Sequence, residues 1–242
     1  MKDFAAGRSS AAERMDNPEA DEAQLIRTLR QFTPINVLFS ASRRLLKRHF
    51  LPRMEANTAA PYTLLDIGAG GCDTALWLSD YCARRNISIR ITCIDNDPRI
   101  AAYARRKTGA SPRVEMIEMS AFDIERLGTF DFIFSNHFMH HLHDSELSAL
   151  LELVHRSTAI RFLMNDLARS KSSYLGFSLF AALFLHRSFA GEDGRISIRR
   201  AFSLPELQGV VRRSPASHRM YTGTAFPGRL FILGNGSDPA ED

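Results

Sequence analysis

The fold is decided by residues 63–73, which read Thr-Leu-Leu-Asp-Ile-Gly-Ala-Gly-Gly-Cys-Asp. An apolar run ending in an acid, a cluster of glycines and the helical-looking residues 74–78 predict a strand, a tight turn and a helix. Glycines let the chain bend sharply and let a ligand lie against the backbone, and the first N–H groups of the helix point at the same place. The stretch therefore predicts a pocket for a nucleotide-like ligand.

The spacing of the glycines argues against a dinucleotide. The dinucleotide pattern G-x-G-x-x-G, counted from Gly68, needs a third glycine at position 73, where this chain has Asp73. A pyrophosphate would meet a carboxylate there. Asp66, two residues before the first glycine, can balance a positive charge or accept a hydrogen bond from an amino group. A cationic ligand therefore fits this turn better than NAD does.

The same stretch resembles the first motif of the class I S-adenosylmethionine (SAM) methyltransferases, acid-x-Gly-x-Gly-x-Gly. Asp66, Gly68 and Gly70 match this motif, whereas the small residue Cys72 replaces its last glycine. The resemblance implies that SAM is the cofactor and S-adenosylhomocysteine (SAH) the product. It also implies that the cofactor contacts Asp66, Gly68, Ala69 and Gly70. The alternative is the strand-to-helix turn of some other α/β protein.

A second strand is predicted over residues 87–95, where β-branched residues end in an acid. An acid at the tip of the second parallel strand lies beside the crevice that would hold a ribose. Asp95 is therefore the candidate acceptor for two ribose hydroxyls, with Asn96 next to it in the cofactor site. Asp97 precedes Pro98 and is expected to begin a helix. The alternative makes Asp95 a turn residue only.

A third short strand is predicted over residues 114–119. In the methyltransferases that the chain resembles, the turn after this strand begins with an acid that meets the adenine amino group. Ser120 stands at that position here, followed by Ala121 and Phe122. The resemblance implies that these three residues border the adenine, the hydroxyl accepting one hydrogen bond and the other two offering backbone and an apolar wall.

The fourth predicted strand, residues 130–134, ends in a run of polar residues. Because the carboxyl ends of parallel strands form the crevice, Ser135 is expected near the cofactor, and Asn136 and His137 are expected where an acceptor meets the methyl group. We expect His137 to be a general base or, as the alternative, a packing histidine. His140 and His141 are expected in the acceptor pocket or in structural roles.

Four histidines within residues 137–143 raise the question of a metal. No glutamate lies between His137 and His141 as in H-E-x-x-H, and a catalytic zinc would still need a third ligand. The three cysteines have no C-x-x-C spacing. We therefore expect no metal, and no disulfide framework either.

A fifth strand over residues 160–167 ends in Asp166, which is expected to orient the acceptor together with Asn136. The apolar residues 174–185 rise only about 18 Å as a helix, too short to cross a bilayer. They form either a buried core helix or the lid of an acceptor pocket within an insertion over residues 168–202. The resemblance favours the lid, because the family places acceptor-site insertions between the fifth and sixth strands. A mobile loop is expected over residues 189–202. The expected pocket residues are Leu175, Phe177 and Phe180.

The N-terminal part is expected to comprise a disordered tail over residues 1–20 and a helical cap over residues 21–58. The first cap helix should end before Pro34, and the second should run to about residue 54 with a basic outer face. Such a face can be solvated, or it can lie on RNA or a membrane surface. The resemblance implies that the cap closes over the ligand site.

These elements predict an α/β fold: a doubly wound, mostly parallel, seven-stranded Rossmann-like sheet with an antiparallel edge and an N-terminal helical extension. The SAM-binding domain should span residues 59–235, closing with strands near residues 218–221 and 229–234. A formal net charge of +4 permits RNA without indicating it, and no DNA partner is expected. No signal peptide or transmembrane segment is evident, so a cytoplasmic location is expected. Nothing in the sequence indicates an oligomeric state.

Two absent signatures narrow the expected substrate. The fourth strand does not end in the Asn/Asp-Pro-Pro-aromatic run of amine methyltransferases acting on bases, and no Pro-Cys of a cytosine C5 mechanism occurs. Residues 165–202 resemble a subgroup linked to polyketide and phenolic-lipid pathways. We therefore expect O-methylation of a small, largely apolar hydroxylated compound. The alternatives are methylation of RNA or another nucleophile, an inactive SAM-binding partner protein, and an NAD-dependent oxidoreductase.

Overall fold

The computed structural model describes residues 7–236 of the chain. Its strands are β1 (Tyr62–Ile67), β2 (Ile89–Asp95), β3 (Val114–Glu118), β4 (Phe130–Asn136), β5 (Thr158–Leu167), β6 (Met220–Ala225) and β7 (Arg229–Asn235). The α-helices are α1 (Glu22–Phe39), α2 (Ser42–His49), α3 (Asp73–Ala83), α4 (Pro98–Thr108), α5 (Asp144–Arg156), α6 (Lys171–Phe184), α7 (Ala190–Arg200) and α8 (Leu204–Arg213). Short 3-10 helices are η1 (Leu51–Arg53), η2 (Ala121–Leu127), η3 (Met139–His141) and η4 (Ser217–Arg219).

The strands form one seven-stranded sheet in the order β3-β2-β1-β4-β5-β7-β6. The first five strands run parallel, and β7 pairs antiparallel with both β5 and β6. The predicted mostly parallel sheet with an antiparallel edge is therefore confirmed. The strand order reverses between β1 and β4, which is where open α/β sheets form a crevice outside the carboxyl ends of their strands.

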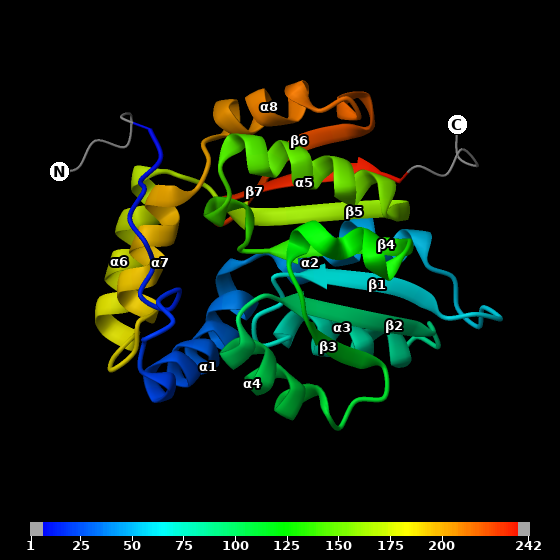
Figure 1. The fold of residues 1–242 in the computed structure, drawn as a ribbon, viewed down its shortest axis with the longest axis horizontal. Coiled ribbons are helices and arrows are strands. Elements are labelled where there is room, and N and C mark those ends of the chain that lie inside the picture. Colours follow the sequence, from blue (N-terminus) through cyan, green and yellow to red (C-terminus); the bar gives the residue numbers. More distant parts are fainter. Residues whose placement is uncertain (1–6, 237–242) are drawn as a thin grey trace.

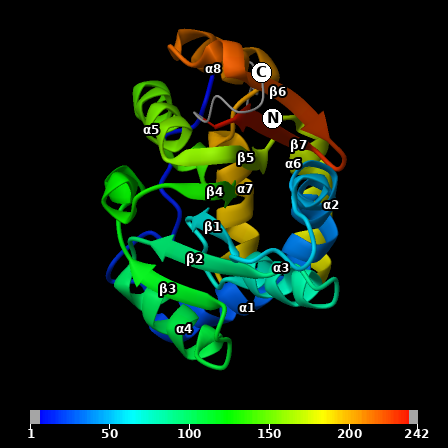
Figure 2. The same ribbon diagram turned by 90° about the vertical axis from the view of Figure 1, so that its right-hand side faces the viewer.

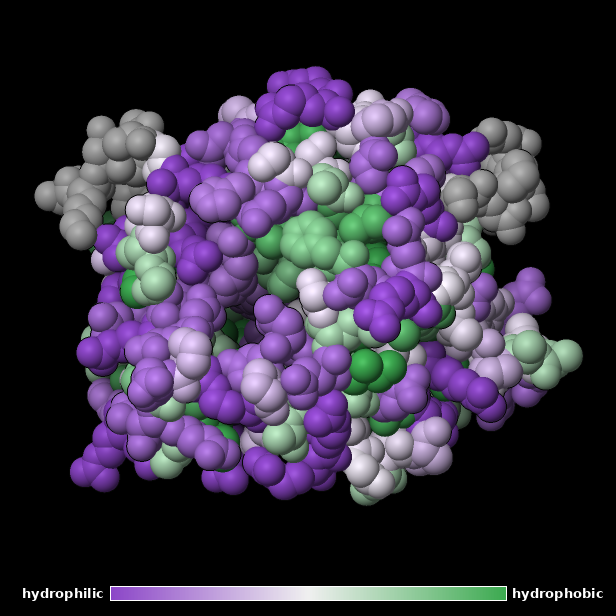
Figure 3. Space-filling view, viewed as in Figure 1, coloured by the Kyte–Doolittle hydropathy of each residue, from purple (hydrophilic) through white to green (hydrophobic). Residues whose placement is uncertain are grey.

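Two apolar cores cover the two faces of the sheet. Because side chains alternate along a strand, neighbours such as Leu64 and Leu65 enter different cores. One core joins the sheet to α5 and α8, and the other joins it to α2, α3 and α4. Figure 2 shows α5 on one side of the sheet and α2 with α3 on the other. On the face seen in Figure 3, polar residues surround a central apolar area.

The carboxyl end of the sheet is enclosed by α1, α6, α7 and the N-terminal residues 7–20, which we name the strap (Figure 1). The strap runs along α7, where the Ser9 N–H donates to the Arg199 carbonyl over 3.0 Å. The Arg8 guanidinium lies 3.7 Å from the centre of the Phe202 ring and donates to the Leu142 carbonyl over 2.7 Å. These contacts replace the disordered tail that we expected over residues 7–20. Residues 1–6 of that tail lie outside the described residues.

The boundary between the two cap helices differs from expectation. Helix α1 continues through Pro34 to Phe39, and the chain breaks instead at Ala41, which has a left-handed φ of 57°. Proline removes one hydrogen bond from a helix, and here that loss does not end it, because Leu29 and Ile35 on the same helix stay buried on either side of it.

The expected mobile loop over residues 189–202 is wrong for most of its length, because residues 190–200 form α7. Two glycines, Gly191 and Gly194, lie inside this helix. A side chain on Gly194 would place its Cβ only 2.2 Å from Cζ of Phe177, so this glycine permits the close packing of α7 against α6. Within residues 7–236, no helix is long and apolar enough to cross a membrane.

Strand β7 provides a test of the packing. A Cβ added to Gly234 would lie 2.2 Å from Cζ of Phe162, a fully buried ring opposite it on β5. Gly234→Ala should therefore lower the free energy of unfolding by about 1–3 kcal/mol through overpacking. Gly209→Ala on α8 is the control, because its Cβ meets only the end of Arg213 at 3.6 Å and alanine favours a helix. Urea denaturation of both variants decides it: equal stabilities would contradict the packing described here.

Candidate functional site

A cavity of about 790 Å³ lies at the carboxyl ends of β1, β2 and β4. Its floor is the glycine turn after β1, and its walls come from α1, α7, the strap and the segments that follow β2, β3 and β4. Of the residues expected in the cofactor site, the structure brings nine to this cavity: Asp66, Gly68, Ala69, Gly70, Asp95, Asn96, Ser120, Ala121 and Phe122.

The turn after β1 has three residues in the left-handed region, Gly68, Gly70 and Cys72, with φ of 65°, 53° and 56°. Gly68 is required twice over, since a Cβ there would also lie 2.6 Å from the Phe138 ring. Cys72 adopts the same strained conformation as the N-cap of α3, where the motif has its last glycine, and its side chain is fully buried. The turn therefore keeps the geometry of the motif despite the substitution.

A buried carboxylate, Asp66, and a partly buried one, Asp95, lie at this turn. Burial, and then the charge of Asp95, raise the pKa of Asp66 to about 8. Burial also raises the pKa of Asp95, whose two oxygens accept from the Gly70 and Asp97 N–H groups, each over 3.1 Å. Burial destabilises the charged form of both acids. A cationic ligand would stabilise that form and is therefore favoured here, whereas an anionic ligand would be repelled.

The expected adenine side of the cavity is formed by the start of η2. Ser120 caps this helix, and its hydroxyl oxygen accepts from the Phe122 N–H over 3.2 Å. That bond leaves the hydroxyl hydrogen as a donor toward the cavity wall. Phe122 remains 40% exposed and offers a ring face beside Ala121.

Four of the expected site residues do not line the cavity: Ser135, Asp166, Leu175 and Phe180. Ser135 is fully buried inside the sheet between Ile67 of β1 and Met164 of β5, so it does not reach the cavity. Asp166 is buried behind the wall, where it binds His140. Alternation along β4 and β5 decides both outcomes, because only every second side chain at a strand end faces the crevice.

The apolar helix α6 reaches the cavity with Phe177 alone among its expected residues. Leu175 is 62% exposed on the outer side of α6. Phe180 packs edge-on against Phe39 of α1, with ring centres 5.0 Å apart. The lid over the cavity is therefore α7, which α6 covers from outside, and the periodicity of α6 alone did not reveal this.

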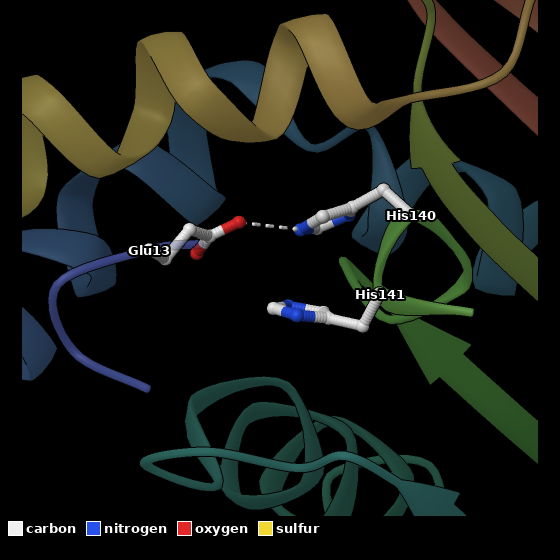
Figure 4. A group of neighbouring side chains, drawn as sticks. All are labelled: Glu13, His140 and His141. Atoms are coloured by element: carbon white, nitrogen blue, oxygen red, sulfur yellow. Dashed lines mark ion pairs between the residues drawn. The ribbon is translucent and has the colours of Figure 1, made fainter. Parts of the chain in front are cut away.

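His140 is held between two buried carboxylates. Its backbone N–H donates to Asp166 over 2.7 Å, its Nδ1 lies 2.9 Å from the same carboxylate, and its Nε2 lies 3.3 Å from Glu13 of the strap. Figure 4 shows Glu13 pointing at His140, with the His141 ring beneath. Burial opposes a charge on His140, but Asp166 and Glu13 outweigh it and raise the pKa to about 9. The imidazole is therefore protonated at neutral pH.

The other members of this cluster come from α7 and from the strap itself. Ser197 donates to Glu13 over 2.8 Å, and Arg200 lies 4.0 Å from Glu13 and 3.5 Å from Asp16. Asp16 also lies 3.5 Å from His141. The strap is thus tied to both α7 and η3. Its acids carried no sequence signal, because their partners lie more than 100 residues away.

Glu13, His140 and His141 each place one ligand atom within 4.8 Å of the others, a spacing that a metal ion could use. A metal would need the lone pair of a deprotonated His140. Because the pKa of His140 is raised to about 9 and both of its nitrogens face carboxylates, we interpret the group as an ion-pair cluster. The expectation of a protein without a metal stays a prediction.

His137 and Asn136 also line the cavity. His137 has a left-handed φ of 60°, and its N–H donates to the Asn165 carbonyl over 3.0 Å. Its Nε2 is buried with no hydrogen-bond partner in the described part of the chain. Burial, and then the charge of Arg229, hold the pKa of His137 well below its usual value, so the ring is neutral. Arg229 also lines the cavity, and no role was assigned to this residue from the sequence.

Residues 64–159 match the family model described as a methyltransferase domain. This match confirms the resemblance seen in the glycine turn. A comparison with curated protein sequences finds no match.

Solved structures extend the likeness beyond the matched residues. The plantazolicin methyltransferase BpumL in complex with SAH is similar with a TM-score of 0.66 at 12% identity, covering 92% of each chain. A SAM-dependent methyltransferase from Aquifex aeolicus has a TM-score of 0.59 at 17% identity, covering 89% of this chain and 98% of that one. Human N-acetylserotonin methyltransferase in complex with SAM has a TM-score of 0.62 at 12% identity, covering 89% of this chain and 56% of that one. At these identities the likeness establishes the fold.

The strap cluster predicts a pH-dependent closure. His140 has a raised pKa, so its contribution is complete below pH 6.5 and is lost as pH rises through about 9. Glu13 and Asp166 have lowered pKa values, so their contributions are lost on acidification below their usual values of 4.5 and 3.8. Glu13→Gln should raise the rate of trypsin cleavage after Arg14 about tenfold at neutral pH, because cleavage tracks the open population.

The control for this experiment is Glu19→Gln, an exposed acid on the same strap. The ratio of the two cleavage rates should fall toward one between pH 7.5 and about pH 10, as wild-type His140 loses its proton. Equal cleavage of both variants at neutral pH would show that the cluster does not hold the strap.

Proposed function

We propose that the protein transfers a methyl group from SAM to the oxygen of a small, largely apolar hydroxylated compound of phenolic or polyketide type. One observation carries this proposal. One cavity joins a glycine turn with two carboxylates, Asp66 and Asp95, to the neutral imidazole of His137, whose Nε2 has no hydrogen-bond partner in the described part of the chain.

The carboxylate side of the cavity suits SAM better than NAD. SAM carries a positive sulfonium and an ammonium group, which Asp66 can balance, and its ribose hydroxyls can donate to Asp95. A pyrophosphate would face both acids and also Asp73, which begins α3 and pairs with Lys107. The oxidoreductase alternative is therefore the weakest of those considered.

The acceptor is assigned to the part of the cavity under α1 and α7. Apolar side chains dominate that part: Leu29, Phe32, Ile35, Phe39, Leu167, Phe177 and Ile198. Similar structures include methyltransferases named for plantazolicin, magnesium protoporphyrin IX and N-acetylserotonin, all of them small molecules. Enclosure by the strap and α7 also favours a small acceptor over RNA, which would need an open, basic groove.

In the proposed reaction the acceptor oxygen attacks the methyl carbon in line with the carbon–sulfur bond. Alignment and exclusion of water supply much of the acceleration. His137 takes the proton from the hydroxyl, and Asn136 orients the acceptor from the neighbouring position. Asp166 does not reach the cavity and instead fixes His140, so its proposed role changes from orienting the acceptor to positioning the wall.

Calorimetry with SAM, SAH and NAD tests the cofactor assignment. We expect micromolar binding of SAM or SAH and none of NAD. Binding of cationic SAM should lower the pKa of Asp66 from about 8 and release a proton near neutral pH, which appears as a dependence of the heat on buffer ionisation. Binding of SAM without turnover of any phenol, polyketide or RNA would favour the inactive partner protein.

Removal of the proposed ribose acceptor should weaken cofactor binding. Asp95→Ala is expected to raise the SAM dissociation constant by an amount equivalent to about 1–3 kcal/mol, because two hydroxyls lose a charged acceptor. Asp123→Ala, in η2 outside the cavity, is the control. An unchanged dissociation constant in a folded Asp95 variant would make this acid a turn residue that only accepts from the Gly70 and Asp97 N–H groups.

The proposed base is tested by His137→Ala with an accepted phenol. Since general-base catalysis contributes about 10²–10⁴ in rate, kcat should fall at least 10²-fold, and the loss should shrink as pH approaches the phenol pKa. His155→Ala on the outer part of α5 serves as the control. A small, pH-independent loss would leave alignment as the mechanism and make His137 a packing residue.

A further inference from the structure

Arg229 is the most deeply buried cation near the cavity. It begins β7, opposite Leu167 of β5 and Ala225 of β6, and its side chain is 1% exposed. Its Nη2 donates to Oδ1 of Asn136 over 3.2 Å. Its Nε and Nη1 are buried and have no hydrogen-bond partner among residues 7–236.

The charge of Arg229 is also without a close counterion. No carboxylate in the described chain lies within ion-pair distance of its guanidinium. Asp166 is the acid that acts on it electrostatically, but that carboxylate is already engaged by His140. Burial lowers the pKa of Arg229 to about 10, so it remains charged at neutral pH. A buried cation with two unpaired N–H groups is costly unless a ligand completes it.

The neighbouring imidazole of His137 also has a buried nitrogen without a partner in the described chain. His137 lines the same cavity, its Nε2 is equally buried and unpartnered, and the charge of Arg229 is the strongest electrostatic influence on it. Asn136 joins the two, being adjacent to His137 in the chain and hydrogen-bonded to Arg229. One wall thus offers hydrogen-bond donors from a guanidinium beside an acceptor nitrogen of a neutral ring.

We propose that Arg229 and His137 form a subsite for an acidic oxygen, so that the acceptor is a phenol, an enol or a carboxylic acid that reacts as its anion. This inference rests on the proposed function. Arg229 stabilises the anion, and His137 Nε2 takes the proton from the O–H group. The oxygen lone pair then forms the bond to the methyl carbon while the carbon–sulfur bond breaks, leaving its electron pair on the neutral sulfide of SAH.

The presence of Arg229 explains how His137, an imidazole of low basicity, can act as the general base. A neutral alcohol would not give its proton to such a ring, whereas an acceptor whose own pKa is lowered by an adjacent guanidinium would. An aliphatic alcohol or a neutral amine would also leave the charge of Arg229 uncompensated in the closed cavity. The subsite therefore selects acceptors by acidity.

Binding to the SAH-loaded protein tests the subsite without turnover. Benzoate and benzamide form one pair of probes, equal in shape and different in charge, and 4-nitrophenol forms a second probe because its phenolate absorbs visible light. We expect benzoate or 4-nitrophenolate to bind at least tenfold more tightly than the matching neutral form. The pKa of bound 4-nitrophenol should fall by about one unit or more. Benzoate preference alone indicates a carboxylic acid acceptor, and a shift of 4-nitrophenol alone indicates a phenol or enol.

Arg229→Met should abolish the preference for the anion, lowering its affinity about 10- to 100-fold, while SAH still binds. Arg229→Lys keeps the charge and should retain part of the preference, which also covers the case in which the methionine variant fails to fold. Arg212→Met, an exposed arginine on α8, is the matched control and should change nothing.

Two failures are distinguishable. If SAH binds but the wild-type protein shows no preference for either anion at millimolar concentration, or Arg229→Lys and Arg229→Met bind both anions as tightly as wild type, the subsite is disproved and the proposed function stands. If neither SAM nor SAH binds, the proposed function itself fails.

Discussion

The enclosure of the site depends on one ionic interaction, the protonated His140 held between Asp166 and Glu13. Both carboxylates and the imidazole are almost fully buried, so the charges are tolerable only as a set. The interaction joins three segments far apart in the chain: the strap, the loop after β4 and the end of β5. With the strap fixed, α1 and α7 close the crevice that the sheet would otherwise leave open to solvent.

Charge is divided across the cavity in a way that matches the proposed chemistry. Asp66 and Asp95 come from β1 and β2, whereas His137 follows β4 and Arg229 begins β7, which lie in the other direction along the sheet. A cationic methyl donor and an anionic acceptor would each meet the opposite charge, with the methyl group between them. Transfer of the methyl group neutralises both reactants, so a closed, water-poor site favours it. The chemistry of neither charged group depends on the strap cluster, but both groups need the enclosure that the strap provides.

The part of the site nearest the glycine turn could be predicted because it depends on local geometry. Asp66, Gly68 and Gly70 stand at fixed spacing from one strand, and Asp95 ends the next, so their common location follows from parallel strands alone. Cys72 also shows that local geometry decides this turn, because its backbone stays left-handed although the motif glycine is missing there. The lid could not be predicted in this way. The segment that contains Gly194 was expected to be a loop, whereas the lack of a side chain at Gly194 permits the packing of α7 on Phe177.

The sequence by itself determined the strands, their mostly parallel direction, the glycine turn and the acids at the strand tips, because periodicity and spacing encode backbone direction and side-chain face. Only the tertiary structure decided that Glu13 meets His140, that Asp166 lies behind the wall and that Arg229 faces the cavity. Pairing of charges between segments far apart leaves no local pattern. Such pairs form because the folded chain must compensate every charge that it removes from water.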